Sequence, residues 1–491
     1  KNFMRVNVFI LLILLSMYLS AQEVLSLEQC KQIALKENIN LQIDSANINM
    51  AIYNKRATFA NFFPNINFSG TYLRLNNQFQ LFENDLFLPV VPYQAIDLST
   101  MQLNPSSFTN PLISLLTFAI DPNTLKPLTD AEGNPIFRNY ALLPADQAKF
   151  GVKDNYIFNF SLLQPVFAGG KIYYANKMTS NAVMMAKYQT DVDKQSLLYE
   201  IEDMYYKLWI TDKKYKLALN YLDLLKQLEN DVKNYIQEGM ATNNQLLMVQ
   251  TKINEAEVNV FKALNGLNLQ KQLLNQKMGR EINIDFTPQD SLILNQEVLQ
   301  LFLNNENDIN NRPEIKLLEQ NVEFNKNMMR VTQADMLPQI GFTTNYFFVN
   351  PNPYNGLAKE FGDDYTLGVT IKVPIFHALE KYNKRQAALV QYKIAQMKMD
   401  EAKNLISIDA NYSANQLKEQ LMQLNVTEEN VDLATENLRL QTNLYHEGVI
   451  KLADLMQAQT MWLEAKTSYY EAYAEVLAFY AKLRKAYGIL E

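Results

Sequence analysis

The chain has 491 residues, of which 48% are hydrophobic and 20% are charged, and its formal net charge is −7. This acidic balance argues against a nucleic-acid partner, which would require a basic surface. The single cysteine, Cys30, excludes a framework of internal disulfides and does not follow the small residues that precede a lipid-attachment site.

Residues 1–21 have the pattern of a secretory signal peptide. Basic residues precede an apolar run from Val8 to Leu19, and small residues follow around an expected cleavage site after Ala21. The run is too short to cross a bilayer as a helix. A retained anchoring helix is the alternative, because Leu19 is larger than the usual residue three places before cleavage. No later run is long and apolar enough to predict a transmembrane helix.

A helical region and a strand follow. From Leu27 to Phe59, apolar residues recur among Lys, Glu and Asn with few breakers, which favours helix. A strand opens at Pro64, where apolar and polar residues alternate. The same pattern returns at Pro338, at an offset of 274 residues.

Residues 74–155 are predicted to form a large loop between the two strands of a hairpin. Eight of the sixteen prolines lie between Pro89 and Pro144, and this density excludes long helices and central strands. The many apolar residues favour a packed loop domain over disorder. The corresponding loop of the second half, 347–364, is short.

An internal duplication organises the rest of the chain. Three pairs of residues share one offset of 209: Tyr156 and Tyr365, Gly239 and Gly448, Gly279 and Gly488. Each copy begins with an alternating strand and continues as a long helical pattern that breaks only near its central glycine. We therefore predict strand, descending helix, turn and ascending helix in each copy. The first descending helix would reach about 100 Å.

The four predicted strands each have an apolar face and a polar face, as membrane strands do. Four strands are too few to close a barrel, and open edges are not tolerated in hydrocarbon, so the chain must oligomerise if these strands lie in a membrane. A soluble sandwich edge covered by helices is the alternative. Aromatic residues at the strand ends fit the girdles of membrane strands: Tyr72, Tyr156, Tyr346, Tyr365, Phe167 and Phe376.

These features together resemble the TolC-type outer-membrane efflux proteins, over the mature chain except the long loop. Besides the order of the duplicated copies, several stretches carry the resemblance: Phe63-Pro64-Asn65-Ile66, Leu337-Pro338-Gln339-Ile340, Gln164-Pro165-Val166-Phe167, Val373-Pro374-Ile375-Phe376, Tyr445-His446-Glu447-Gly448-Val449 and Asp454-Leu455-Met456-Gln457-Ala458-Gln459. The resemblance implies a mainly α fold with a small β part. Long coiled helices would form an α-barrel, and four transmembrane strands per chain would contribute to a trimeric twelve-stranded β-barrel.

With that fold, eight segments are expected. They are a signal peptide (1–21), an N-terminal periplasmic helical region (22–63), a first β-hairpin (64–167) with the extracellular loop 74–155, a first long helical hairpin (168–279) with its tip at 239, an equatorial connector (280–311), a helix (312–337), a second β-hairpin (338–376) with the loop 347–364, and a second long helical hairpin (377–491) with its tip at 448.

The resemblance also implies a function. The chain would be the outer-membrane exit duct of a tripartite efflux or type I secretion system in a Gram-negative type of cell, extending into the periplasm. It would pass drugs, metals or proteins and would need no cofactor. Its partners would be two further copies of itself, outer-membrane lipid, a periplasmic adaptor (membrane fusion) protein and an inner-membrane transporter of RND, ABC or related type.

The resemblance assigns two sets of site residues. Glycine turns at the periplasmic tips meet the adaptor in this family, and these positions correspond to Gly239, Met240, Gly448 and Val449. Acidic residues shortly after the second turn narrow the pore. Asp454 takes the first acidic position, Gln457 stands where some members have a second aspartate, and Gln245 is the counterpart of Asp454 in the first copy. Asp454 as a helix cap is the alternative.

Other functions have weaker support in the sequence. His377 and His446 lack the companions of a metal or catalytic site, so no enzyme is expected. Asparagine and serine on the polar strand faces suit a wet lumen better than a hydrolase site: Asn67, Ser69, Asn159 and Ser161. Nineteen methionines raise the possibility of copper or silver export, although methionine also fills long coiled helices. A periplasmic coiled-coil tether is the alternative function, but a tether has no use for four amphipathic strands.

Overall fold

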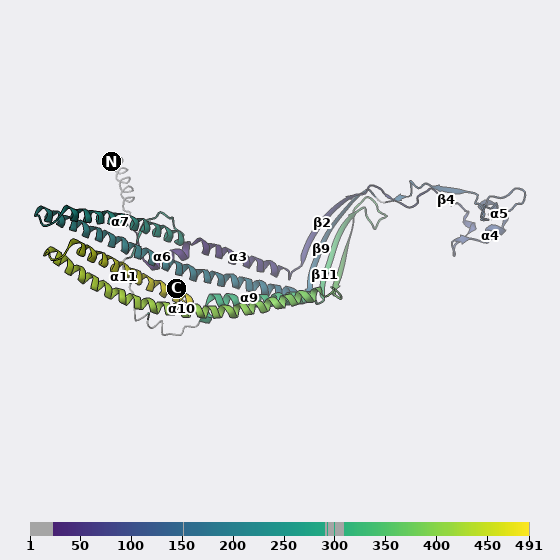
Figure 1. Ribbon diagram of the computed structural model, residues 1–491. Helices are drawn as coiled ribbons and strands as arrows, with labels where there is room; N and C mark the ends of the chain where they lie inside the picture. The colour runs from purple at the N-terminus through teal and green to yellow at the C-terminus, as the bar shows by residue number, and fades with distance from the viewer. Residues whose placement is uncertain (1–22, 151, 290–291, 293–298, 300–308, 491) are drawn as a thin grey trace, which may run out of the picture. The chain divides into compact units, whose positions relative to one another are not determined.

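The computed structural model describes residues 23–150, 152–289, 292, 299 and 309–490. The expected signal peptide and most of residues 290–308 of the expected connector lie outside the described residues. The chain divides into two units, which are drawn in Figure 1. One is a helical unit (Lys1–Ala60, Gly169–Leu337 and Pro374–Glu491), and the other is a strand unit (Asn61–Ala168 and Pro338–Val373).

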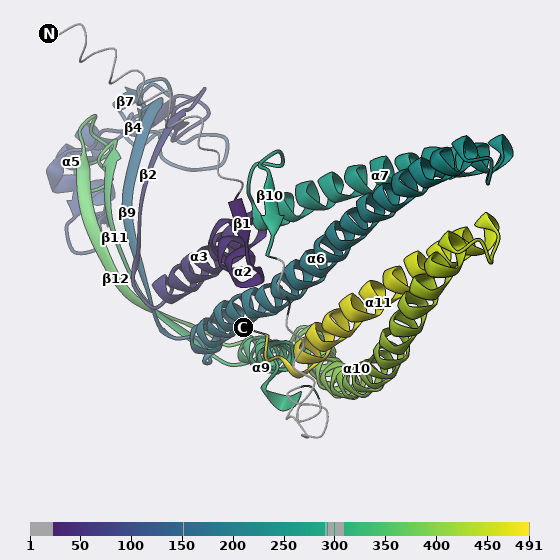
Figure 2. The same cartoon turned by 90° about the vertical axis from the view of Figure 1, so that its left-hand side faces the viewer.

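Two helical hairpins of equal length dominate the helical unit (Figure 2). Helices α6 (Lys171–Gln237) and α10 (Glu380–His446) have 67 residues each, and α7 (Asn243–Met278) and α11 (Leu452–Tyr487) have 36 each. All four boundaries of the first hairpin recur in the second at an offset of 209 residues, which confirms the predicted duplication. A helix of 67 residues is about 100 Å long.

Three shorter helices complete this unit: α2 (Leu27–Glu37), α3 (Ile39–Ala60) and α9 (Pro313–Ala334). The region from Leu27 to Phe59 is helical as expected, but it is divided into two helices at Asn38. The backbone of Asn38 is extended there, and its side-chain oxygen accepts hydrogen bonds from the backbone N–H groups of Asn40 and Leu41. One asparagine therefore ends α2 and caps α3.

A short parallel pair of strands that the sequence analysis missed also belongs to the helical unit. Strand β1 (Glu23–Leu25) pairs with β10 (Phe286–Pro288) beside α2 and α6. The short 3₁₀ helix η2 (Ile309–Asn311) precedes α9. No helix in the described part of the chain has the length and hydropathy needed to cross a membrane.

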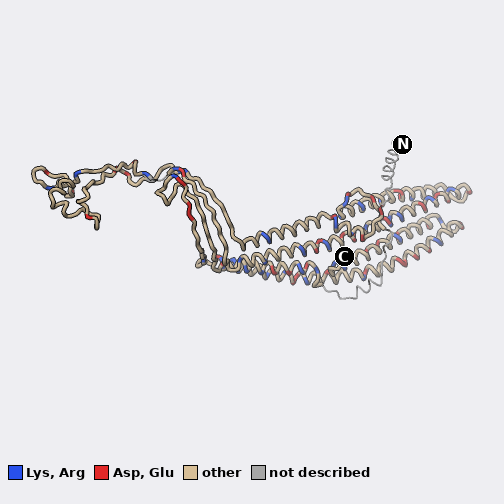
Figure 3. Tube along the Cα trace, turned by 180° about the vertical axis from the view of Figure 1, so that it is seen from behind, with Lys and Arg blue, Asp and Glu red and all other residues tan. Residues whose placement is uncertain are grey.

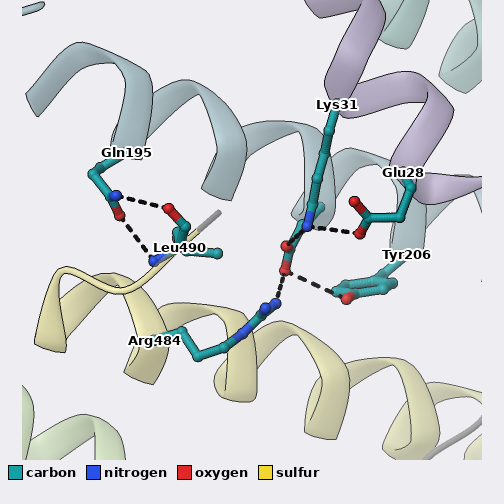
Figure 4. Close-up of polar contacts among 7 residues, drawn as sticks. Glu28, Lys31, Gln195, Tyr206, Arg484 and Leu490 are labelled. Atoms are coloured by element: carbon teal, nitrogen blue, oxygen red, sulfur yellow. Dashed lines mark hydrogen bonds and ion pairs between the residues drawn. The ribbon is translucent and has the colours of Figure 1, made fainter. Parts of the chain in front are cut away.

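A buried carboxylate joins three helices of this unit (Figure 4). Glu202 of α6 is fully buried, and its carboxylate lies 2.7 Å from Nζ of Lys31 on α2 and pairs with Arg484 on α11. The hydroxyl of Tyr206 donates to the same carboxylate at 3.5 Å. Because Lys31 is itself only 5% exposed on its side chain, the ions stabilise one another in a site that water does not reach.

The strand unit contains an antiparallel sheet with the strand order β12-β11-β9-β2. Its strands are β2 (Asn65–Arg74), β9 (Asp154–Phe167), β11 (Gln339–Asn350) and β12 (Gly362–Lys372). The two predicted hairpins are present as β2 with β9 and β11 with β12. Among the described residues, β2 and β12 have a partner on one side only, so they are the edge strands.

The long segment between β2 and β9 folds into short elements. Its helices are α4 (Ser106–Thr109), α5 (Pro111–Thr117) and the 3₁₀ helix η1 (Tyr93–Ala95). Three strand pairs are formed by β3 (Phe79–Gln80) with β8 (Lys149–Phe150), β4 (Leu86–Pro89) with β7 (Tyr140–Leu143), and β5 (Ile96–Asp97) with β6 (Gln102–Leu103). Phe118 is fully buried against the rings of Phe108 and Phe137, so the segment has a small core of its own.

Candidate functional site

One face of the four-stranded sheet is apolar. Side chains alternate along each strand, so the register determines which residues share a face. The shared apolar face contains Ile66, Phe68 and Tyr72 of β2, Tyr156, Phe158, Phe160 and Leu162 of β9, Ile340, Phe342, Tyr346 and Phe348 of β11, and Tyr365, Leu367, Val369 and Ile371 of β12. The four β12 side chains are each 64–65% exposed. An exposed apolar face of this kind marks a contact with lipid or with protein.

The opposite face of the sheet is mainly polar, although it also contains Leu73, Ile157, Leu163, Phe347 and Val349. Asn67 faces Ser161, and Ser69 faces Asn159, across the β2–β9 ladder. The Asn345 amide donates to the Thr366 hydroxyl at 3.2 Å across the β11–β12 ladder. The sheet therefore has the two-sided chemistry that the alternation in the sequence predicted.

A tyrosine and an aspartate form the same hydrogen bond in both hairpins. The Tyr72 hydroxyl donates to Asp154 at 2.8 Å, and the Tyr346 hydroxyl donates to Asp363 at 2.8 Å. The tyrosines are related by the offset of 274 and the aspartates by the offset of 209. Each bond holds a tyrosine of the apolar face to the neighbouring strand.

The other aromatic residues predicted for a girdle lie at different depths. Tyr346 and Tyr365 face each other, but they are not at the strand ends as expected, because β11 continues to Asn350 and β12 already begins at Gly362. The loop between them is thus shorter than the predicted 347–364. Phe167 is the last residue of β9, whereas Phe376 follows β12 and is 83% exposed.

Gly239 and Gly448 lie in the turns that join the long helices. Both have left-handed backbone, with φ of 76° and 73°, which glycine adopts without a steric cost. An added Cβ would meet nothing within 4 Å at either position, so the glycines serve the turn and not a close contact. Their neighbours Met240 and Val449 are 70% and 67% exposed.

The two tips contact each other within the helical unit. The Tyr235 hydroxyl and Nδ1 of His446 form a hydrogen bond of 3.0 Å. Tyr445 packs its ring 6.1 Å from that of Tyr235, and burial raises the pKa of its hydroxyl. Tyr445 belongs to an apolar cluster that all four long helices share. Nothing in the sequence singled out Tyr235. His446 was named as part of the stretch around Gly448 and as a histidine without metal or catalytic companions, but not as a partner of Tyr235.

Asp454 and Gln457 lie one turn apart on α11, and both are exposed. They line a groove of about 910 Å³ between α10 and α11, together with polar residues that include Asn430, Asn437, Gln441 and Glu464. Asp454 also accepts a hydrogen bond from the backbone N–H of Lys451 at 3.2 Å. Gln245 accepts the equivalent bond from Thr242 at 2.8 Å at the start of α7. Asp454 thus caps its helix and lines the groove at the same time.

The described residues contain no group of three His, Cys, Asp or Glu side chains that could hold a metal ion. Cys30 is fully buried next to α6, and burial raises the pKa of its thiol to about 12. The thiol is therefore protonated at neutral pH and is a packing residue of the core.

Comparison with known proteins agrees with this architecture. A sequence model of a family described as outer membrane efflux protein matches residues 306–489. No curated protein sequence matches the chain.

Solved channels have a similar fold. The outer membrane protein VceC from Vibrio cholerae aligns with a TM-score of 0.68 and 13% identity over 94% of this chain and 96% of its own. The CmeC channel from Campylobacter jejuni aligns with a TM-score of 0.68 and 13% identity over 94% and 85%. The open MtrE channel from Neisseria gonorrhoeae aligns with a TM-score of 0.64 and 14% identity over 95% and 89%. These likenesses confirm the predicted fold class.

Proposed function

We propose that the chain is a TolC-like outer membrane efflux protein and that it is the exit duct of a tripartite efflux or type I secretion system. The family model over residues 306–489 and the likeness to solved channels support this proposal. Its location is the outer membrane, and its long helices extend into the periplasm. The observation that carries the proposal is the exposed apolar face of the four-stranded sheet, which lies opposite a polar face. Hydrocarbon on one side and water on the other suit these two faces.

A homotrimer satisfies the two open edges of this sheet. In a membrane, the edges β2 and β12 cannot remain unpaired, because hydrocarbon offers their backbone groups no partner. Pairing β2 of one protomer with β12 of the next closes a barrel, and three chains supply twelve strands. The long hairpins of the three chains would surround the continuing duct.

The tips of the long hairpins would bind the adaptor, and the groove would form part of the pore wall. Met240 and Val449 present exposed apolar side chains beside the two turns, where a periplasmic adaptor would contact them. The adaptor would connect the duct to an inner-membrane transporter of RND, ABC or related type, and the cargo would be drugs, metals or proteins. Asp454 from each protomer, with Gln457 one turn away, would line the narrowest part of the pore.

Conductance measurements in planar bilayers test whether the protein forms a channel. Purified protein should produce stepwise conductance in a lipid bilayer. Leu367→Lys places a charge on the exposed apolar face and should abolish conductance, because a lysine facing lipid near the bilayer centre costs about 2–4 kcal/mol per chain. Thr366→Lys on the polar face is the matched control and should still conduct.

Two results would contradict the proposal that the protein is a channel. One is a folded wild-type protein that gives no conductance, and the other is a Leu367→Lys variant that conducts as the wild type does. A periplasmic tether, the alternative function, would also separate from outer membranes during fractionation.

A further inference from the structure

Basic residues gather at one end of the helical unit. We call this the strand-adjacent end and define it as residues 45–60 of α3, 171–190 of α6, 320–334 of α9 with its C-cap Asp335, and 380–399 of α10. It contains twelve lysines and arginines, two in α3, three in α6, two in α9 and five in α10, against three acidic residues. The whole chain has a net charge of −7, so this end is opposite in sign to the remainder. Figure 3 shows the basic residues along these helix ends.

Each of these helix ends is joined to a strand by a short connection. The connections from α3 to β2, from β9 to α6, from α9 to β11 and from β12 to α10 contain three to seven residues. An extended residue spans at most about 3.5 Å, so the chain holds each helix end within about 25 Å of its strand. The basic residues in the turns of each helix next to the connection are therefore the ones close to whatever surrounds the strand ends.

The acidic residues of the strand-adjacent end are already paired within it. Asp335 lies 2.7 Å from Nζ of Lys171 and accepts a second hydrogen bond, through its backbone carbonyl, from Lys381. These contacts also tie the ends of α6, α9 and α10 together. The other two acids pair within their own helices, Glu323 with Lys326 and Glu380 with Lys384. Within the strand-adjacent end, the twelve cations outnumber the three acids by nine.

Tyrosine rings accompany the cations on three of the helices. The cation lies 5.6 Å from the ring centre for Arg56 and Tyr53, 4.9 Å for Lys177 and Tyr173, and 5.0 Å for Arg330 and Tyr174. Tyr53 is 65% exposed and Tyr173 is 49% exposed. A tyrosine with an apolar ring, a polar hydroxyl and a neighbouring cation is suited to the boundary between hydrocarbon and water.

The segment before α10 adds exposed apolar side chains at the same end. Ile375 is 92% exposed, Phe376 is 83% exposed and Leu379 is 69% exposed. Ala378 and Leu379 have left-handed backbone, with φ of 44° and 65°, at positions where the first copy has glycine. This conformation costs a non-glycine residue free energy, yet the second copy keeps an exposed leucine there.

We propose that the strand-adjacent end is a docking surface for anionic phospholipids in the periplasmic leaflet of the outer membrane. The lysines and arginines bind the lipid phosphates, the tyrosines lie at the level of the headgroups, and the apolar segment before α10 enters the acyl region. This inference rests on the proposed function, because only strands that lie in the membrane bring these helix ends to the headgroups. Charge complementarity selects anionic lipid over zwitterionic lipid.

The test compares two lipids on the full-length protein in neutral detergent. Phosphatidylglycerol and phosphatidylcholine with the same acyl chains are added separately, and the thermal unfolding temperature is followed by circular dichroism. Phosphatidylglycerol should raise the unfolding temperature more than phosphatidylcholine does. High salt should reduce the difference, since it screens exposed charges.

A pair of triple variants locates the effect. Lys177→Gln/Lys384→Gln/Arg385→Gln removes three cations of the strand-adjacent end and should reduce the difference between the two lipids by about half. Lys226→Gln/Lys262→Gln/Lys418→Gln removes three exposed cations elsewhere and should leave the difference unchanged. Comparing the lipids within each variant cancels any change in basal stability.

An equal effect of both lipids on the wild type, or an equal loss in both triple variants, would overturn the inference. Bilayer conductance distinguishes this failure from a failure of the proposed function. A protein that conducts in pure phosphatidylcholine bilayers but shows no preference for phosphatidylglycerol is a channel without this docking surface. A protein that does not conduct fails the proposed function itself.

Discussion

Asp454 combines a structural contact with a position in the groove, and the two roles predict different outcomes. Asp454→Asn keeps an oxygen that can accept the hydrogen bond from Lys451, so the start of α11 should be preserved. It removes the negative charge, however, and a ring of fixed negative charge selects cations. We expect lower cation selectivity for Asp454→Asn and higher selectivity for Gln457→Asp, measured as reversal potentials in a salt gradient.

As a control, both variants must still form trimers. Unchanged selectivity in both, with trimers intact, would leave Asp454 with the capping role only.

Two glycines with the same backbone conformation should respond differently to substitution. Gly239 and Gly279 have φ of 76° and 85°, so alanine at either costs about 1–2 kcal/mol in backbone strain. At Gly279 the added Cβ would also lie 2.7 Å from the carbonyl carbon of Glu37, whereas at Gly239 it would meet nothing within 4 Å. Gly279→Ala should therefore lower the thermal unfolding temperature in detergent clearly more than Gly239→Ala. Equal shifts would contradict the close approach of α2 to the end of α7.

Single residues could be predicted from the sequence where the local backbone conformation needs a particular residue type. The turn glycines could be predicted because glycine is absent from the long helical patterns on either side of Gly448. The contact between Tyr235 and His446 could not be predicted. Its partners are 211 residues apart, and the pairing depends on how the two hairpins pack together.

The buried charges around Glu202 hold α2, α6 and α11 together. Glu202→Gln removes one of the two counterions of Lys31, whose side chain is only 5% exposed, and also the partner of Arg484. Lys31 keeps only its pair with the exposed Glu28, so the variant should destabilise the protein by about 3 kcal/mol. Glu257→Gln is the matched control, because Glu257 is 53% exposed and its ion pair with Lys226 spans 3.6 Å. The control should change stability by about 0.5 kcal/mol or less. Similar unfolding midpoints for the two variants would show that the Glu202 cluster does not tie the helices.

The long helices could be predicted because the sequence repeats itself at an offset of 209 residues. The duplication located both long hairpins, and their boundaries recur at one offset. The break between α2 and α3 was missed because asparagine is frequent throughout this region, and only the hydrogen bonds of Asn38 distinguish it as a cap. The extension of β11 beyond Tyr346 was missed because the alternation weakens there, while pairing with β9 and β12 continues to hold the strand.

For the whole molecule, the fold class came from the resemblance to a known family, and two features of the sequence agreed with it. Helical patterns too long for a globule indicated an extended helical unit, and four amphipathic strands were too few to close a membrane barrel within one chain. The segment between β2 and β9 could be predicted only as a packed loop. Its elements are too short for a periodic pattern, and its core depends on contacts such as those of Phe118.

The central claim is that three chains close the sheet through the edges β2 and β12 around one pore. Native mass spectrometry of the protein extracted in mild detergent measures this directly. We expect one dominant species with the mass of three chains. A folded monomer that remains stable with both sheet edges unpaired would contradict it.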